Sequence, residues 1–224
     1  MIKKNFTKKL FLAFSIFFFC SFFQKEEKKT YTYDEYIGKT KFQTTWTVEK
    51  KDDKILIEGE EKNAITKLIC KPSFEIENYS FEIKDEKTNY EISKDKNILH
   101  LKGLSKNKKI EKKFNIKNTP WIQQLSFGLI PFMASKKKSL KFYIVNPRDF
   151  SLIKMVVKKQ NLETLSIKDK KYKAQKIKVT LPGIKKFFWK AYLYFDTETN
   201  DFLKYVGNTG PNTPIKTTLL NSKK

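Results

Sequence analysis

Arginine and glycine are scarce in this 224-residue sequence, and both scarcities limit what the protein can bind. Arg148 is the single arginine among 47 basic residues. Specific nucleic-acid and phosphate sites usually rely on the planar guanidinium fork, which lysine cannot replace. The seven glycines form no G-x-G-x-x-G, Walker-type or G-x-S-x-G motif. We therefore predict no specific nucleic-acid partner.

Histidine and cysteine are scarcer still. His100 is the only histidine, which excludes a histidine-based metal site. Of the two cysteines, Cys20 falls in the N-terminal leader, so Cys70 alone cannot form an intramolecular disulfide once the leader is removed. Adjacent acidic pairs such as Asp52-Asp53 stand beside lysines in turn-like segments, which suits solubility better than acid–base catalysis. The sequence predicts a protein that is not an enzyme and uses no metal or cofactor.

Lysine, in contrast, is abundant. Every basic residue except Arg148 is a lysine, and the formal net charge is +23. The lysines are spread along the chain, apart from runs such as Lys136–Lys138. Two interpretations remain open: solvated outer faces of strands, or a surface that meets an anionic membrane or another polyanion. Polyanion binding would weaken steeply with added salt.

Residues 1–24 have the pattern of a signal peptide or a short membrane anchor. Lysines precede the apolar run Leu10–Phe23, and a charged segment follows it. The run is shorter than the roughly 20 residues that span a bilayer. No A-x-A cleavage site occurs, so the N-terminus is cleaved, lipidated at Cys20 or retained. We predict export to the periplasm or cell envelope, a tether over 25–30 and a single β-rich domain over 31–220.

The body of the chain alternates between apolar and polar residues. Phe42, Thr44, Trp46 and Val48 share one face of a predicted strand, and similar short strands recur every 8–12 residues between polar turns. This rhythm predicts a mainly β protein with a strongly curved antiparallel sheet or an open β-barrel. The segment Lys186–Gly207 predicts its central hairpin, with a strand that begins at Phe187 and carries aromatic side chains on both faces.

One segment interrupts the strand rhythm, Thr119–Met133. Thr119 resembles an N-cap and Pro120 a first helical residue, while Gly128 and Pro131 are expected to end the helix. We predict one short inserted apolar helix that either completes the core or covers an apolar cavity.

The last third of the chain resembles an exported, sheet-rich bacterial domain family of unknown function. The resemblance rests on Leu162–Ile167, Tyr172–Ile177, Trp189 and Phe202–Tyr205. The overall plan, a curved sheet with a short helix on its concave side, is similar to periplasmic lipoprotein carriers, which implies a role in lipid handling.

These observations lead to a functional hypothesis and an alternative. The hypothesis is non-enzymatic binding of an apolar or lipid-like ligand in the concave face of the sheet, with lysines at the rim. The predicted ligand-binding residues are Trp121, Leu125, Leu129, Trp189, Tyr192 and Tyr194, and Arg148 is a candidate anion-binding residue. The alternative is a solid-cored scaffold or protein-interaction domain of the envelope that holds no ligand. Its protein partner is unknown.

Overall fold

The computed structural model describes residues 27–61, 63–208 and 213–224. The predicted signal peptide, with Cys20, lies outside the described residues. Within the described part of the chain, no helix is long and apolar enough to cross a membrane.

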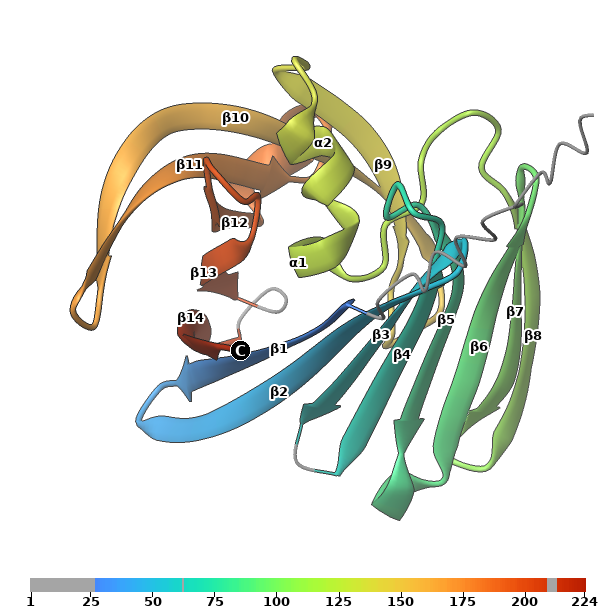
Figure 1. Cartoon of the computed structure of the whole chain (residues 1–224). Coiled ribbons are helices and arrows are strands. Elements are labelled where there is room, and N and C mark those ends of the chain that lie inside the picture. The colour runs from blue at the N-terminus through green and yellow to red at the C-terminus, as the bar shows by residue number, and fades with distance from the viewer. Residues whose placement is uncertain (1–26, 62, 209–212) are drawn as a thin grey trace, which may run out of the picture.

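In these described residues, fourteen strands form one antiparallel sheet, and two short α-helices lie against it (Figure 1). In chain order the elements are β1 (Glu27–Ile37), β2 (Thr40–Lys51), β3 (Lys54–Glu61), β4 (Ala64–Cys70), β5 (Ile76–Ile83), the 3₁₀ turn η1 (Lys84–Glu86), β6 (Thr88–Asp95), β7 (Ile98–Ser105), β8 (Lys108–Asn115), α1 (Leu125–Gly128), α2 (Ile130–Ala134), β9 (Ser139–Val145), β10 (Leu152–Ile167), β11 (Lys170–Thr180), the 3₁₀ turn η2 (Gly183–Phe187), β12 (Lys190–Asp196), β13 (Phe202–Asn208) and β14 (Ile215–Lys223). The predicted fold class, a curved antiparallel sheet with a short apolar helical insertion, is confirmed.

The first and last strands of the chain pair with each other. The strand order is β8 to β1, then β14 to β9, so β1 and β14 join two meanders into one sheet. The two meanders curve around α1 and α2, and β8 and β9 form the two edges of the sheet (Figure 1). The concave side of the sheet therefore faces the helices.

Tight turns connect most neighbouring strands. Asp52, Lys96, Asn107 and Lys168 adopt left-handed backbone conformations in these turns. Two-residue hairpins favour such conformations because their twist matches that of the flanking strands. The polar turns read from the sequence are therefore the points at which the chain reverses.

Aromatic side chains hold α1 against the concave face. The Phe127 ring centroid lies 5.2 Å from that of Trp46 on β2 and 6.2 Å from that of Tyr31 on β1. Trp46 in turn lies directly against Gly59 of β3, where a Cβ atom would fall 2.5 Å from the indole ring. Glycine is required at this position because the indole occupies the space of a side chain.

The helical segment differs from its prediction in where it begins. Thr119 and Pro120 do not start a helix, because the backbone there pairs with β9: the Tyr143 N–H donates to the Pro120 carbonyl at 2.8 Å. Gln124 is the residue before α1, which ends at Gly128 as expected, whereas Pro131 lies in the first turn of α2. Proline is tolerated there because a first-turn N–H has no partner within the helix.

Two further predictions need correction. The tether expected over 25–30 is partly strand, since Glu27–Thr30 pair with Thr47–Lys50 of β2. The late hairpin is confirmed as β12 and β13, but its first strand begins at Lys190. Phe187 lies in η2 and is exposed. The prediction that residues 187–189 belong to the strand was therefore wrong.

The two edges of the sheet are joined by side chains. Lys112 of β8 donates to the carbonyl oxygens of Asp149 and Phe150, in the turn between β9 and β10, at 3.0 and 3.3 Å. The Phe150 ring also packs edge-on against Tyr90 of β6, with 5.2 Å between centroids. The sheet thus curls almost into a barrel without β pairing between its edges.

Candidate functional site

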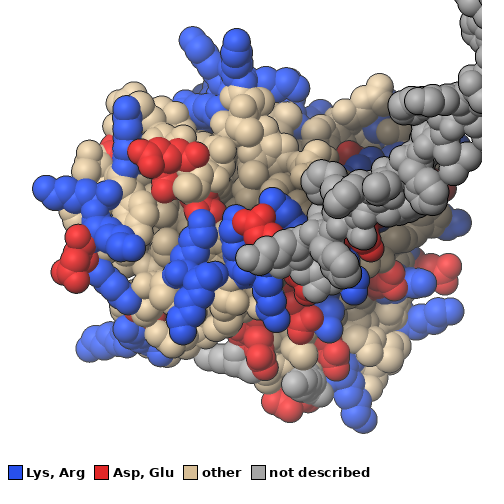
Figure 2. Space-filling model, in the orientation of Figure 1, with Lys and Arg blue, Asp and Glu red and all other residues tan. Residues whose placement is uncertain are grey.

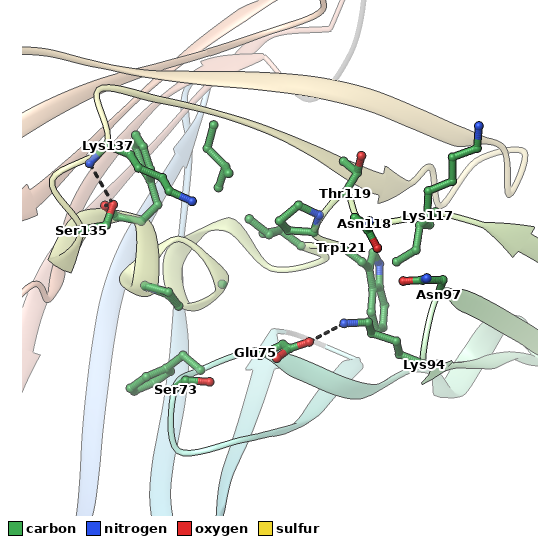
Figure 3. A pocket seen from close by; sticks show the side chains of 18 residues that line it. Ser73, Glu75, Lys94, Asn97, Lys117, Asn118, Thr119, Trp121, Ser135 and Lys137 are labelled. Carbon is green, nitrogen blue, oxygen red and sulfur yellow. Dashed lines mark hydrogen bonds and ion pairs between the residues drawn. The ribbon is translucent and has the colours of Figure 1, made fainter.

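A pocket of about 480 Å³, which we call the main pocket, lies beside the two α-helices on the concave side of the sheet (Figure 3). Its apolar wall includes Trp121, Ile122, Phe132 and Leu140. Trp121 and Ile122 are buried, and the Ile122 N–H donates to the Tyr143 carbonyl at 2.9 Å, which ties this wall to β9. Ligand pockets in proteins usually enclose roughly 300–1,000 Å³ and are mainly apolar. The pocket therefore has the size of a small-molecule site, with an apolar wall and, around the rest of it, polar residues such as Ser73, Asn97 and Thr119.

A glutamine fixes the Trp121 ring in this wall. The indole N–H donates to the Gln123 side-chain oxygen at 3.2 Å. The same Gln123 side chain accepts from the Val145 N–H at 3.0 Å and donates to the Val145 carbonyl at 2.9 Å. All of these groups are buried, so losing any of these hydrogen bonds would be costly. The indole ring is therefore held in one orientation.

Charged side chains surround the opening of the pocket. Lys94, Lys117 and Lys137 line it together with a single acidic residue, Glu75, which pairs with Lys94 (Figure 3). The hydrogen bond from Lys94, supported by Lys71, holds the pKa of the Glu75 carboxyl below its usual value, although partial burial opposes this effect. The rim therefore has a net positive charge.

Phe74 separates this pocket from a smaller one. Phe74 lines the main pocket and also a second hollow of about 170 Å³, which Tyr31 and Phe127 line as well. Phe74 has a φ of +62°, which is uncommon for a residue with a large side chain. A bond from its own N–H to the Lys71 carbonyl, 2.8 Å long, holds this conformation.

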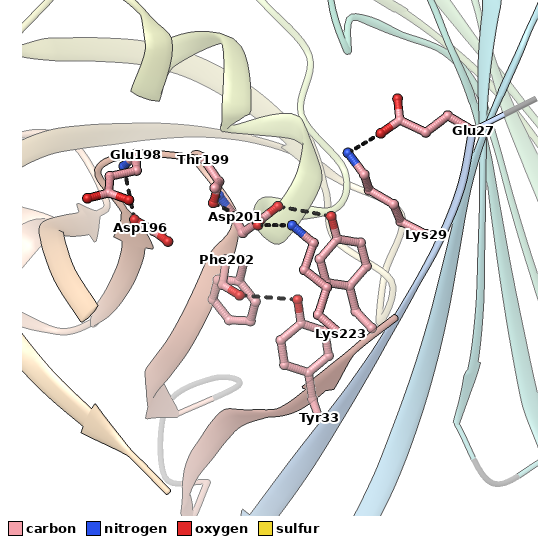
Figure 4. A network of polar contacts seen from close by, with 10 residues as sticks. Glu27, Lys29, Tyr33, Asp196, Glu198, Thr199, Asp201, Phe202 and Lys223 are labelled. Atoms are coloured by element: carbon pink, nitrogen blue, oxygen red, sulfur yellow. Dashed lines mark hydrogen bonds and ion pairs between the residues drawn. The ribbon is translucent and has the colours of Figure 1, made fainter. Parts of the chain in front are cut away.

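A hydrogen-bond network closes the wall of the smaller hollow (Figure 4). The Tyr31 hydroxyl donates to Asp201 at 2.9 Å, Lys223 pairs with the same carboxylate, and the Tyr33 hydroxyl donates to the Phe202 carbonyl at 3.2 Å. Burial, followed by the nearby Asp201 charge, raises the pKa of Tyr31 above its usual value. The phenol groups are therefore neutral donors that connect β1 to β13 across β14.

Lys159 of β10 holds the end of α2. Its ammonium group donates to the carbonyl oxygens of Met133 and Ser135 at 3.0 and 2.6 Å, and it lies 5.1 Å from the centre of the Phe132 ring. The last carbonyls of a helix have no partner within the helix and carry partial negative charge. Burial lowers the pKa of Lys159 from its usual value. Nothing in the sequence pattern distinguished this lysine from its neighbours.

The structure divides the six predicted ligand-binding residues between two sides of the sheet. Trp121 lines the main pocket, and Leu125 and Leu129 belong to the helical segment that packs in the concavity. On β12, Ala191, Leu193 and Phe195 are buried on one face, so Tyr192 and Tyr194 project from the opposite, convex face, where Tyr194 is also buried and belongs to the core.

Contacts of the convex face agree with this division. The Lys176 ammonium lies 4.9 and 5.5 Å from the centres of the Tyr192 and Tyr194 rings. Trp189 and Tyr192 line a separate hollow of about 280 Å³. The structure therefore does not bring all six residues together in one concavity, because Tyr192 and Tyr194 lie on the face of β12 opposite Leu193, where Tyr194 is buried beneath Lys176.

Arg148 lies exposed in the turn that joins β9 to β10. Within the described residues no ion pair links it to Asp149, whose side chain instead accepts from the Ser151 N–H and hydroxyl at 2.9 and 2.7 Å. Anion binding by Arg148 stays a prediction. The described residues also contain no cluster of histidine, cysteine and acidic side chains that could hold a metal ion.

These features define a class: an open, β-barrel-like protein whose concavity holds a helical segment with an apolar pocket beside it. Neither the protein-family models nor the curated proteins include a match. Among solved structures, the chain is similar to a β-barrel-like protein of the domain of unknown function DUF1849 from Brucella abortus, with a TM-score of 0.56, 8% identity, and 88% of this chain and 97% of that one covered. This likeness confirms, for the fold, the resemblance to a sheet-rich family of unknown function.

Two other solved structures match less well. The hypothetical lipoprotein YmcC from Escherichia coli has a TM-score of 0.41 and 10% identity over 87% of this chain and 86% of that one. A LolA superfamily protein from Nitrosomonas europaea has a TM-score of 0.26 and 10% identity over 91% and 87%. Scores this low support no inference about function.

Proposed function

We propose that this chain is an exported, non-enzymatic envelope protein that binds an apolar or lipid-like ligand in the pocket beside α1 and α2. The pocket of about 480 Å³, walled by Trp121 and other apolar side chains, is the observation that carries the proposal. Export rests on the N-terminal sequence, whose basic start and apolar run are typical of a signal peptide.

The pocket combines an apolar wall with a positively charged rim, which suits an amphiphilic ligand. An acyl chain in the pocket would gain about 0.8 kcal/mol for each CH₂ group removed from water. An anionic head group would then lie at the opening, where Lys117 and Lys137 are exposed and Lys94 is partly neutralised by Glu75. We expect dodecanoate to bind more tightly than dodecanol, since only the acid places a negative charge among these lysines.

Displacement of a fluorescent fatty acid tests the proposal, with a variant that fills the pocket. Leu140→Trp adds a large ring to the pocket wall, whereas Leu162→Trp makes the same change on β10 at a side chain that is 51% exposed and outside the pocket. We expect the first variant to lose probe binding by about tenfold or more, since it removes the space for several CH₂ groups. The second should bind as the wild type does. Equal binding by both variants would contradict the proposed site.

A solid-cored scaffold is the competing function, and one observation favours it. Phe127, Leu129, Phe132 and Met133 of the helical segment are buried and fill much of the concavity. Native mass spectrometry of the purified protein separates the two functions. A lipid that co-purifies with the wild type but not with the Leu140→Trp variant would support ligand binding. A wild-type protein that carries no lipid and also binds no added fatty acid would support the scaffold.

A further inference from the structure

The most exposed large apolar side chains of the described residues gather at one place on the surface. Ile184, Phe187 and Phe188, in or next to η2, are 80%, 78% and 73% exposed, and Ile215 at the start of β14 is 65% exposed. Phe187, Phe188 and Ile215 border the same hollow of about 280 Å³. We call these four residues the apolar patch. Isolated exposed apolar residues are ordinary, but a contiguous group of this kind usually marks an interaction surface.

The local backbone presents the patch to solvent in a fixed way. Gly183, with a φ of +63°, turns the chain out of β11, and the Phe188 N–H donates to the Lys185 carbonyl at 3.1 Å. The Trp189 indole N–H donates to the Asn208 carbonyl at 2.9 Å, which joins the segment between η2 and β12 to the end of β13. The exposed rings therefore stand on an ordered turn that is anchored to the sheet.

Positive charge surrounds the patch. The sequence between residues 170 and 195 contains eight lysines and no acidic residue, and residues 202–224 also lack acidic residues. Lys185, Lys186 and Lys190 are exposed beside the patch, and the Lys186 ammonium lies 5.0 Å from the centre of the Phe187 ring. Elsewhere acidic side chains lie among the lysines, as Figure 2 shows for one face. The lysines of η2 and β12 beside the patch thus have no acidic neighbour in the sequence, whereas Lys216, next to Ile215, pairs with Glu35 and Glu61.

We infer that the apolar patch and its lysines dock the protein onto the surface of an anionic phospholipid bilayer. Phenylalanine and tryptophan rings insert at the boundary between head groups and acyl chains, while lysines beside them meet anionic head groups. The observed arrangement, exposed rings on a turn with lysines around them, matches these two requirements together. A protein partner with an apolar surface would not require the exposed lysines that stand beside the two rings.

Co-sedimentation with vesicles tests this inference, with variants matched for charge and for apolar character. Phe187→Ser combined with Phe188→Ser removes both rings from the patch, and Leu162→Ser removes an exposed apolar side chain on β10 as a control. Lys185→Gln combined with Lys186→Gln removes two charges beside the patch. Lys108→Gln combined with Lys109→Gln removes two exposed charges from β8, at an edge of the sheet.

We expect the wild type to bind vesicles that contain phosphatidylglycerol and to bind pure phosphatidylcholine vesicles far less. The Phe187/Phe188 variant should lose at least about tenfold in affinity for the anionic vesicles. The Lys185/Lys186 variant should lose about fivefold per lysine at low salt. Both control variants should stay within about twofold of the wild type, because their substitutions lie outside the patch.

Three results would overturn the inference. The Phe187/Phe188 variant could bind anionic vesicles as the wild type does. Alternatively, substitution of the β8 lysines could lower the affinity for these vesicles as much as substitution of Lys185 and Lys186. Sedimentation velocity could also show a wild-type dimer that these two phenylalanine substitutions dissociate, which would make a second copy the partner. The inference is independent of the proposed ligand: the phenylalanine variant should still bind the fluorescent fatty acid, and Leu140→Trp should still bind vesicles.

Discussion

The ammonium group of Lys159 donates a hydrogen bond of 3.0 Å to the carbonyl oxygen of Met133. One residue on the sheet thereby fixes the end of the helical segment that borders the main pocket. The contact matters because neither α1 nor α2 has a side chain that caps its N-terminus. The position of α2 depends on this lysine and on the buried rings beneath it.

Replacing Lys159 with methionine should loosen α2. The substitution leaves the carbonyls of Met133 and Ser135 without this donor, and hydrogen bonds to charged groups contribute roughly 1.5–3 kcal/mol. We expect a loss of about 1–3 kcal/mol in the free energy of unfolding and faster amide exchange within residues 130–134. Lys158→Met, at an exposed neighbouring position, is the control. Unchanged exchange in the Lys159 variant would show that the buried rings alone hold the helix.

Truncating Phe74 should lengthen the pocket. Its side chain lies between the main pocket and the smaller hollow, so Phe74→Ala should join the two spaces. In a series of fatty acids, the wild-type affinity should rise about fourfold per CH₂ and then level off. In the variant the plateau should move to longer chains. Phe114→Ala, a half-buried ring on β8 outside both pockets, should leave the plateau in place.

Adding a side chain at Gly59 should disturb the packing of Trp46. A Cβ atom there would lie 2.5 Å from the indole, so the ring, and Phe127 above it, would have to move. Overpacking of this kind destabilises proteins by about 1–3 kcal/mol. We expect Gly59→Ala to lower the free energy of unfolding by this amount in urea denaturation, while Glu60→Ala on the exposed face changes it little. An unchanged free energy of unfolding in Gly59→Ala would show that Trp46 packs loosely against β3.

The Glu75–Lys94 pair should make part of the stability pH-dependent. The pair lowers the folded-state pKa of Glu75, so its stabilising effect is complete above the unfolded-state pKa, about 4.3. That effect should disappear as the pH falls through the folded-state pKa. The difference in stability between the wild type and Glu75→Gln should therefore be constant near neutral pH and shrink in acid. A difference that grows in acid would contradict the lowered pKa.

Alternation along the sequence predicted the sheet and its late hairpin, because burial of one face gives a strand a period of two. It could not decide which face of β12 is internal, since Leu193 and Tyr194 are both large and apolar. The pairing of β1 with β14 joins residues as many as 192 positions apart, as in Tyr31 opposite Lys223, and no local pattern specifies it.

The inserted segment shows a second limit of the sequence. Thr119-Pro120 has the residues of a helix start, but hydrogen bonds with the backbone of Tyr143 keep the chain extended there. Tertiary pairing overrode the local preference. Trp121 was predicted as a site residue and does line the main pocket, whereas Phe74 and Lys159 were missed because their roles arise only from contacts distant in sequence.

The three tryptophans allow ligand binding in the concave pocket to be tested directly, because each reports on a different place. Trp46 packs beneath α1, Trp121 lines the main pocket and Trp189 lines the hollow beside the apolar patch. The measurement is a titration of ¹⁵N-labelled protein with dodecanoate, followed through the three indole N–H signals. We predict a saturable shift of the Trp121 signal with little change at Trp189. A saturable shift confined to Trp189, or no shift at any of the three, would contradict ligand binding in the concave pocket.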